Sequence, residues 1–141
     1  MPCTTPLRQG MNSTPKPVVL CVDDEPEVLK LLEEWLSRSG LGVTAMSASD
    51  GPAALRSVAK TTPDLILLDI IMPGMSGFEF METMTTSPEY RKPPVIIISN
   101  LGQESDIKRG ESLGAVGYFV KAKISMDEIL QNIEVFFSKA K

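Results

Sequence analysis

The chain contains no histidine. This absence excludes every site that depends on an imidazole: a Ser-His-Asp or Cys-His nucleophile pair, an imidazole proton shuttle and a histidine-ligated zinc site. Any chemistry of this protein must therefore use carboxylates, hydroxyls, lysine and metals that bind oxygen.

Cysteine is scarce as well. Cys3 and Cys21 are the two cysteines, and their spacing matches no metal-binding or redox motif. Cys21 lies inside an apolar run, where a free thiol is usually a small buried hydrophobic residue. We therefore expect a reducing, cytoplasmic compartment.

Long hydrophobic runs and basic clusters are also missing. No stretch approaches the roughly 20 apolar residues that a membrane span needs, and the amino terminus has no apolar core of signal-peptide type. The 14 basic residues are scattered and are outnumbered by 18 acidic residues, which gives a net charge of −4. We expect a soluble protein that binds neither nucleic acid directly nor a membrane.

The length and composition indicate one domain. The chain has 141 residues, of which 43% are hydrophobic, enough for a single core. Residues 1–17 carry four prolines among polar residues, and we expect a flexible leader there, part of which could be a cloning remnant. Residues 18–141 are expected to form the domain.

Short apolar runs alternate with longer amphipathic segments in the domain. The periodicity predicts five strands, at 18–22, 43–46, 65–68, 95–98 and 117–120. Helices are expected over 26–39, 52–60, 77–86, 104–113 and from 126 to near the end, with capping-box pairs Ser76/Glu79 and Ser125/Glu128. Strands that alternate with helices predict a parallel sheet between two helix layers, a three-layer α/β domain.

Polar residues follow most of the predicted strands. Asp23 and Asp24 follow the first strand, Asp69 the third, Ser99 the fourth and Lys121 the fifth. Each alone is more often a turn former, a helix cap or a solvated charge. Because ligands of open parallel sheets bind at the carboxyl ends of the strands, their joint occurrence favours one common site.

Charge balance at this site favours a metal. Three carboxylates and one lysine leave a net charge of −2, which a divalent cation would neutralise. Oxygen ligands without histidine indicate Mg²⁺, with Mn²⁺ as an alternative, and no EF-hand loop is present for calcium. A metal-bound carboxylate beside a lysine suits in-line attack on a phosphoryl group, and an ionised carboxylate needs no general base. The histidine used in such a transfer can belong to a partner.

Four segments carry a family resemblance: Val22-Asp23-Asp24-Glu25, the run LLDIIMPGMSG from Leu67 to Gly77, Ile98-Ser99, and Gly114-Ala115 with Tyr118 and Lys121. With these motifs the chain, over about residues 18–139, resembles the receiver domain of two-component response regulators. The resemblance implies a flavodoxin-like (βα)5 fold whose five-stranded parallel sheet has the order 2-1-3-4-5.

The resemblance also implies roles for the strand-end residues. Asp69 would be the phosphoacceptor, and Asp24 and Asp69 would bind Mg²⁺ directly. Asp23 would bind the ion through water, and the backbone carbonyl of Ile71 would complete the protein ligands. Lys121 would contact the acyl phosphate.

Two further residues resemble the family's switch pair. The Ser99 hydroxyl would turn to the phosphoryl group and the Tyr118 ring would follow inward, which reshapes the surface of the fourth helix, fifth strand and fifth helix. Two positions depart from the usual pattern. Ala122 follows the lysine where proline is common, and Asn100 follows Ser99 where a smaller residue is usual.

The resemblance implies partners and a function. A sensor histidine kinase or histidine phosphotransfer protein would donate the phosphoryl group, and a downstream protein target, whose identity stays open, would receive the signal. The chain would be a monomer or a phosphorylation-dependent dimer that catalyses only its own phosphorylation and dephosphorylation. Both a free-standing regulator and a receiver from a longer protein fit these observations.

Two alternatives remain. The departures at Asn100 and Ala122 leave room for a receiver-like scaffold that binds proteins without being phosphorylated. A Mg²⁺-dependent phosphohydrolase of the haloacid dehalogenase type is less favoured, because such enzymes usually carry a second Asp where this chain has Ile71.

Overall fold

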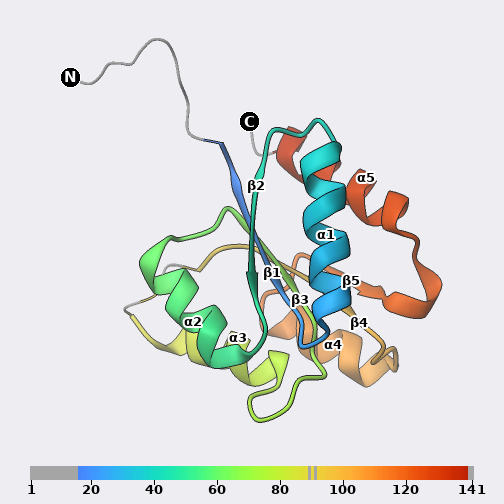
Figure 1. The fold of residues 1–141 in the computed structure, drawn as a ribbon. Coiled ribbons are helices and arrows are strands. Elements are labelled where there is room, and N and C mark those ends of the chain that lie inside the picture. The colour runs from blue at the N-terminus through green and yellow to red at the C-terminus, as the bar shows by residue number, and fades with distance from the viewer. Residues whose placement is uncertain (1–15, 89, 91, 140–141) are drawn as a thin grey trace.

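The structure, a computed structural model, describes residues 16–88, 90 and 92–139 (Figure 1). Its elements are β1 (Val18–Val22), α1 (Pro26–Arg38), β2 (Thr44–Ala48), α2 (Gly51–Lys60), β3 (Leu65–Leu68), α3 (Gly77–Thr86), β4 (Val95–Ser99), α4 (Glu104–Ser112), β5 (Gly117–Val120), the 3-10 helix η1 (Lys121–Lys123) and α5 (Met126–Lys139). The predicted strands and helices are all present, with small differences at their ends. The predicted leader lies outside the described residues except for residues 16 and 17.

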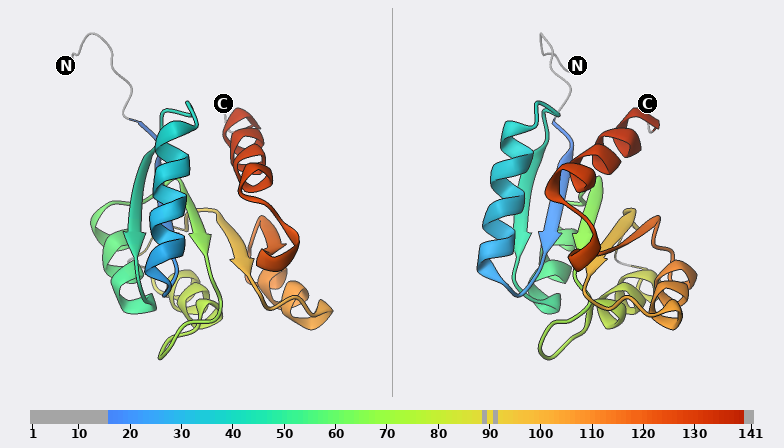
Figure 2. Two further views of the ribbon diagram at one scale, coloured as in Figure 1. Left: turned by 45° about the vertical axis from the view of Figure 1, so that its right-hand side comes forward. Right: turned by 90° about the vertical axis from the view of Figure 1, so that its right-hand side faces the viewer.

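The five strands form one parallel sheet in the order β2-β1-β3-β4-β5. This order confirms the predicted flavodoxin-like fold, and helices cover both faces of the sheet (Figure 2). The chain runs outward in one direction from β1 to β2 and in the other from β3 to β5. The carboxyl ends of β1 and β3 therefore meet at the point where the strand order reverses, which is where such sheets bind ligands.

The sheet divides the hydrophobic core into two clusters. Side chains alternate along β1 with the period of a strand, so Leu20 and Val22 face α2 and α3. Val19 and Cys21 face α1 and α5 on the other side. Burial, with smaller contributions from the charges of Glu33 and Asp23, raises the pKa of the Cys21 thiol to about 12. The thiol therefore stays protonated, as predicted for a small buried hydrophobic residue.

The two edge strands, β2 and β5, are less buried than the three central strands. In β2, Thr44 and Ser47 are exposed and Ala48 is the buried residue, whereas all four residues of β5 are half-buried. An edge strand has a neighbour on one side only, and less of it is covered. The apolar pattern of β2 is correspondingly weak, and the strand covers Thr44–Ala48 instead of the predicted 43–46.

Helix α4 is attached to the domain by few residues. Gly110 is its buried residue, and a Cβ atom at that position would lie 3.0 Å from the ring of Tyr118. On the other side, the guanidinium of Arg109 lies 4.5 Å from the centre of the Phe78 ring, and its Nη2 is 3.1 Å from Glu82 Oε1. These contacts attach α4 to Tyr118 of β5 and to the side chains of Phe78 and Glu82 in α3.

Among the described residues, no helix combines the length and the hydrophobicity that crossing a membrane requires.

Candidate functional site

Strand register places two aspartates side by side at the carboxyl edge of the sheet. Val22 of β1 is paired with Leu68 of β3, so the next residues, Asp23 and Asp69, are neighbours. The Asp69 N–H donates to the Val22 carbonyl at 2.9 Å, and the Asp23 N–H donates to the Ala48 carbonyl at 3.2 Å. The ladder hydrogen bonds thus continue for one residue beyond the strands and fix both backbones.

The strand-end side chains each close the same local turn. In each case a side-chain oxygen accepts a hydrogen bond from the backbone N–H two residues further along. The three bonds run from the Glu25 amide to Asp23 Oδ1 at 2.9 Å, from the Ile71 amide to Asp69 Oδ1 at 3.3 Å and from the Leu101 amide to Ser99 Oγ at 3.3 Å. Oδ2 of each aspartate is left to face the site.

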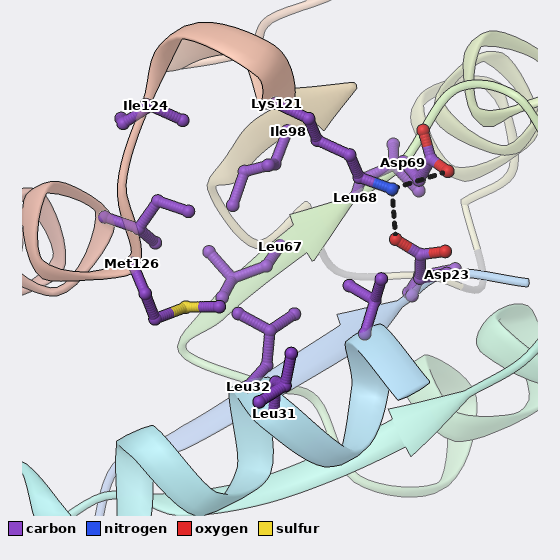
Figure 3. A pocket seen from close by; sticks show the side chains of 13 residues that line it. Asp23, Leu31, Leu32, Leu67, Leu68, Asp69, Ile98, Lys121, Ile124 and Met126 are labelled. Atoms are coloured by element: carbon purple, nitrogen blue, oxygen red, sulfur yellow. Dashed lines mark hydrogen bonds and ion pairs between the residues drawn. The ribbon is translucent and has the colours of Figure 1, made fainter. Parts of the chain in front are cut away.

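Lys121 lies between these two carboxylates (Figure 3). Its Nζ is 2.8 Å from Asp23 Oδ2, 3.3 Å from Asp69 Oδ2 and 3.4 Å from Glu25 Oε1. The side chains of Asp23 and Asp69 are only 4% and 5% exposed. One ammonium therefore faces two buried carboxylates and a third, exposed one, and the cluster keeps an excess of negative charge.

Asp24 adds a further carboxylate at the surface. One oxygen each from Asp23, Asp24 and Asp69 lies within 4.8 Å of the others. In front of them is a hollow of about 200 Å³, lined by Asp24, Glu25, Asp69, Ile71, Asn100 and Lys121. An oxygen-only donor set with room for several waters, of about 30 Å³ each, fits Mg²⁺, which keeps part of its hydration shell.

The pKa values of Asp69 and Lys121 reflect both burial and the neighbouring charges. Burial, and then the charge of Asp23, raise the pKa of Asp69, although Lys121 and hydrogen bonds from Ser99 and Ile71 act in the opposite direction. For Lys121 burial lowers the pKa, but the hydrogen bond to Asp23 and the charge of Asp69 outweigh it and the net pKa is raised. A cation beside Asp69 would favour its ionised form, which is the nucleophilic form.

Ser99 and Tyr118 are connected through the backbone of one residue. Ser99 is fully buried, and its hydroxyl acts to lower the pKa of the Asp69 carboxyl. The Tyr118 hydroxyl donates to the Leu101 carbonyl, while the Leu101 N–H donates to Ser99 Oγ. The half-buried Tyr118 ring packs against Gly110 of α4. A path of direct contacts therefore leads from Ser99 to α4.

The structure brings together the aspartates, Ser99 and Lys121. Tyr118 lies outside this group and is connected to Ser99 through the backbone of Leu101. Sequence reasoning missed two participants, Glu25 and Leu101. The acidic run from Asp23 to Glu25 was a usable signal for the first. Leu101 acts through its backbone, so no side chain could have indicated it.

Two further residues, Ile71 and Ala122, lie next to the site. Ile71 lies at its edge, 51% exposed, and its amide contacts Asp69, while the metal-binding role of its carbonyl stays a prediction. No cis peptide bond occurs in the described part of the chain, so the Lys121–Ala122 bond is trans.

The sequence matches known proteins over most of its length. The model of the response regulator receiver domain family matches residues 19–134. The gliding motility regulatory protein of Myxococcus xanthus is 36% identical over 116 residues, which are 82% of this chain and 15% of that protein. Response regulator PleD of Caulobacter vibrioides is 38% identical over 103 residues, 73% of this chain and 22% of that protein. The chain thus spans less than a quarter of either curated relative.

Solved structures share the fold. The Vibrio cholerae chemotaxis protein CheY4 superposes with a TM-score of 0.76 at 27% identity, covering 85% of this chain and 98% of that chain. The receiver domain of the Francisella response regulator 1452 gives a TM-score of 0.79 at 25% identity, covering 89% of this chain and 100% of that chain.

Proposed function

This chain belongs to the response regulator receiver domain family, and from that membership we propose that it is a phosphoacceptor switch of a two-component phosphorelay. A histidine of a sensor kinase or of a histidine phosphotransfer protein would donate the phosphoryl group to Asp69. The observation that carries the proposal is the surroundings of Asp69 Oδ2: it lies at the end of β3, 3.3 Å from Lys121 Nζ and beside two further aspartates.

The proposed transfer needs a nucleophile but no base. Asp69 Oδ2 attacks the phosphorus in line, the new O–P bond forms as the N–P bond of the phosphohistidine breaks, and the electron pair returns to the imidazole nitrogen. An ionised carboxylate has no proton to lose, which suits a chain without histidine. Lys121 would move from Asp69 Oδ2 to the arriving phosphoryl oxygens and neutralise part of their charge.

The acidic cluster is the proposed Mg²⁺ site, with Mn²⁺ as an alternative. Asp24 and Asp69 would hold the ion directly, Asp23 would hold it through water, and the Ile71 carbonyl would be a further ligand. When bound, the cation supplies positive charge to the transferring phosphoryl oxygens and balances the carboxylates.

The signal would leave the site through the Ser99–Leu101–Tyr118 path. Phosphorylation replaces about one negative charge by about two and adds acceptor oxygens that attract the Ser99 hydroxyl. Movement of Ser99 breaks its bond to the Leu101 amide and changes the loop whose carbonyl holds Tyr118. The altered surface of α4, β5 and α5 would then bind a protein target or a second copy of the chain.

The proposal is tested by intact mass after incubation with acetyl phosphate, with and without Mg²⁺. We expect the unsubstituted protein to gain one phosphoryl group that requires the metal, and Asp69→Asn to gain none. Asp127→Asn is the matched control, because Asp127 is an exposed aspartate in the first turn of α5. No gain under any condition would favour the phosphorylation-independent scaffold, and a gain by Asp69→Asn would place the acceptor elsewhere.

A further inference from the structure

A cavity of about 160 Å³ lies between α1 and the segment that leads into α5, beneath Lys121, and it opens to solvent beside Leu31, which is 47% exposed (Figure 3). Apolar side chains from three parts of the chain form most of its wall. They include Leu31 and Leu32 from α1, Leu67 and Ile98 from the sheet, and Ile124 and Met126 from the segment before and at the start of α5.

The polar residues of the wall are already satisfied by one another. They are Asp23, Asp69 and Lys121, which form the ion pairs at 2.8 and 3.3 Å described above. The remaining oxygen of each aspartate accepts a backbone N–H. Two carboxylates and one ammonium also leave this rim negative. The rim therefore has no free donor for an anion, and its carboxylate oxygens already accept from Lys121 and from backbone N–H groups.

We propose that this cavity is a binding site for a small uncharged aromatic molecule of about the size of benzene. Water finds few hydrogen-bond partners along this apolar wall, and an apolar occupant that replaces the water would gain dispersion contacts with the wall. The volume of the cavity is sufficient for one benzene molecule, since an apolar cavity of about 150 Å³ binds benzene in another protein. The Met126 thioether adds a sulfur that makes favourable contacts with an aromatic ring.

The wall of the cavity is anchored rather than loose. Leu32 and Ile129 are 6% exposed and Leu67 is 2% exposed, and all three belong to the core cluster beneath α1 and α5. Closing the cavity would pull these side chains out of a packed core. The site uses residues of the proposed phosphoacceptor region, but its occupancy requires neither metal nor phosphorylation.

The test is a titration of the whole chain with benzene in the absence of Mg²⁺ and phosphodonor. We expect the methyl resonances of Leu32, Ile98 and Met126 to shift in a saturable way, with half-saturation on the order of 1 mM. Saturation with benzene should also raise the Tm by roughly a few degrees. Absence of a saturable shift in these methyl groups would overturn the proposal.

Val28→Phe tests the location of the site. Val28 is a half-buried residue of α1 in the cavity wall, so a phenylalanine there would fill the space, weaken benzene binding at least about tenfold and keep or raise the Tm. Val135→Phe is the matched control: Val135 is 52% exposed on α5 and lies outside this wall. It should bind benzene as the unsubstituted protein does.

A second filling variant keeps the test decisive if Val28→Phe lowers the Tm. Ile124→Phe fills the same cavity from the segment before α5, outside any helix or strand. Loss of benzene binding in this variant supports the site. Retention of full affinity in a folded filling variant would place the binding elsewhere and overturn the proposal.

Discussion

Asp23 and Asp69 use their two carboxylate oxygens in the same way. Oδ1 accepts the amide two residues further along, and Oδ2 faces Lys121. The local turn fixes the rotation of each carboxylate before any ligand arrives, so the oxygen that faces the site needs no further ordering. The geometry of this site is therefore set largely by backbone bonds at the strand ends.

Removal of the central ammonium should destabilise the metal-free protein. In Lys121→Met two buried carboxylates lose their counter-charge, and we expect the free energy of unfolding to fall by about 3 kcal/mol. Urea unfolding in the presence of EDTA measures this loss. The matched control is Lys123→Met, in the same 3-10 turn but exposed, which should change stability by less than about 0.5 kcal/mol. Equal effects of the two variants would contradict the ion-pair explanation.

Tyr118 should make a stability contribution that disappears in alkali. Burial, with the charges of Asp106 and Asp69, raises the pKa of Tyr118 above the ordinary 10.0. Because the folded chain holds the phenol proton more tightly than the unfolded chain, the contribution is complete below the ordinary pKa and is lost as pH rises through the raised one. At neutral pH we expect the free energy of unfolding of the unsubstituted protein to be about 1 kcal/mol higher than that of Tyr118→Phe.

The measurement is urea unfolding of both proteins at a series of pH values. The difference between them should shrink as the pH rises above about 10, when the unfolded phenol ionises first. A difference that stays constant across this range would show that Tyr118 contributes through packing alone.

At the scale of elements, the start of α3 and the loop that carries Asp69 are in close contact. Gly77 is the first residue of α3, and its N–H donates to the Ile70 carbonyl at 2.9 Å. A Cβ atom on Gly77 would lie 2.5 Å from the Asp69 carbonyl oxygen and 2.8 Å from Ile70 Cα. Those atoms belong to the backbone and cannot turn aside, so only glycine allows this approach.

Gly77→Ala should therefore displace the backbone of Asp69. We expect a loss of about 2 kcal/mol in the free energy of unfolding and large chemical-shift changes at the amides of residues 69–71. Gly117→Ala is a suitable control, since the atoms nearest to its added methyl lie at an ordinary 3.4 Å or more. The explanation fails if Gly77→Ala is as stable as Gly117→Ala.

The elements that the sequence predicted best are those with a strong local pattern. Leu65–Leu68 is apolar throughout and ends at an aspartate, and both of its boundaries agree with the prediction. The capping boxes at Ser76 and Ser125 are confirmed by reciprocal hydrogen bonds with Glu79 and Glu128. Such signals depend on neighbours within four residues, which the sequence displays directly.

Features that depend on contacts between distant elements could be predicted only in part. Parallel strands have their carboxyl ends at one edge, so topology was enough to bring Lys121 near Asp23 across 98 positions. It was not enough to show that Glu25 joins them, because that depends on where α1 begins. The cavity beneath Lys121 was also invisible, since periodicity tells which face of a helix is apolar but not how closely two faces pack.

At the scale of the whole molecule, folding brings together negative charge that the unfolded chain keeps apart. Asp23 and Asp24 precede Asp69 by more than forty residues, yet their oxygens meet within 4.8 Å in the folded chain. A cation that binds this cluster binds only the folded state and must stabilise it. The increase in stability on metal binding therefore measures the affinity of the cluster for the metal.

Mg²⁺ should therefore raise the Tm of the protein, and EDTA should reverse the effect. At a free concentration one hundred times the Kd, the expected stabilisation is about 2.7 kcal/mol, and thermal unfolding at increasing Mg²⁺ measures it. Asp24→Asn should lose most of this increase. Glu27→Gln, which changes an exposed acid in the first turn of α1, should keep it. An undiminished increase in Asp24→Asn would exclude the acidic cluster as the metal site.

The attachment of α4 has a consequence for how this molecule can diverge. The buried residue of this helix is Gly110, which has no side chain, and Arg109 contacts α3 at one edge. Most of its outward residues, such as Glu104, Ser105 and Lys108, can therefore be replaced with little effect on the core. Gene duplication followed by change at these positions would give daughter proteins that keep the same site and differ in what they recognise. The least buried helix is thus where new specificity can evolve with the smallest loss of stability.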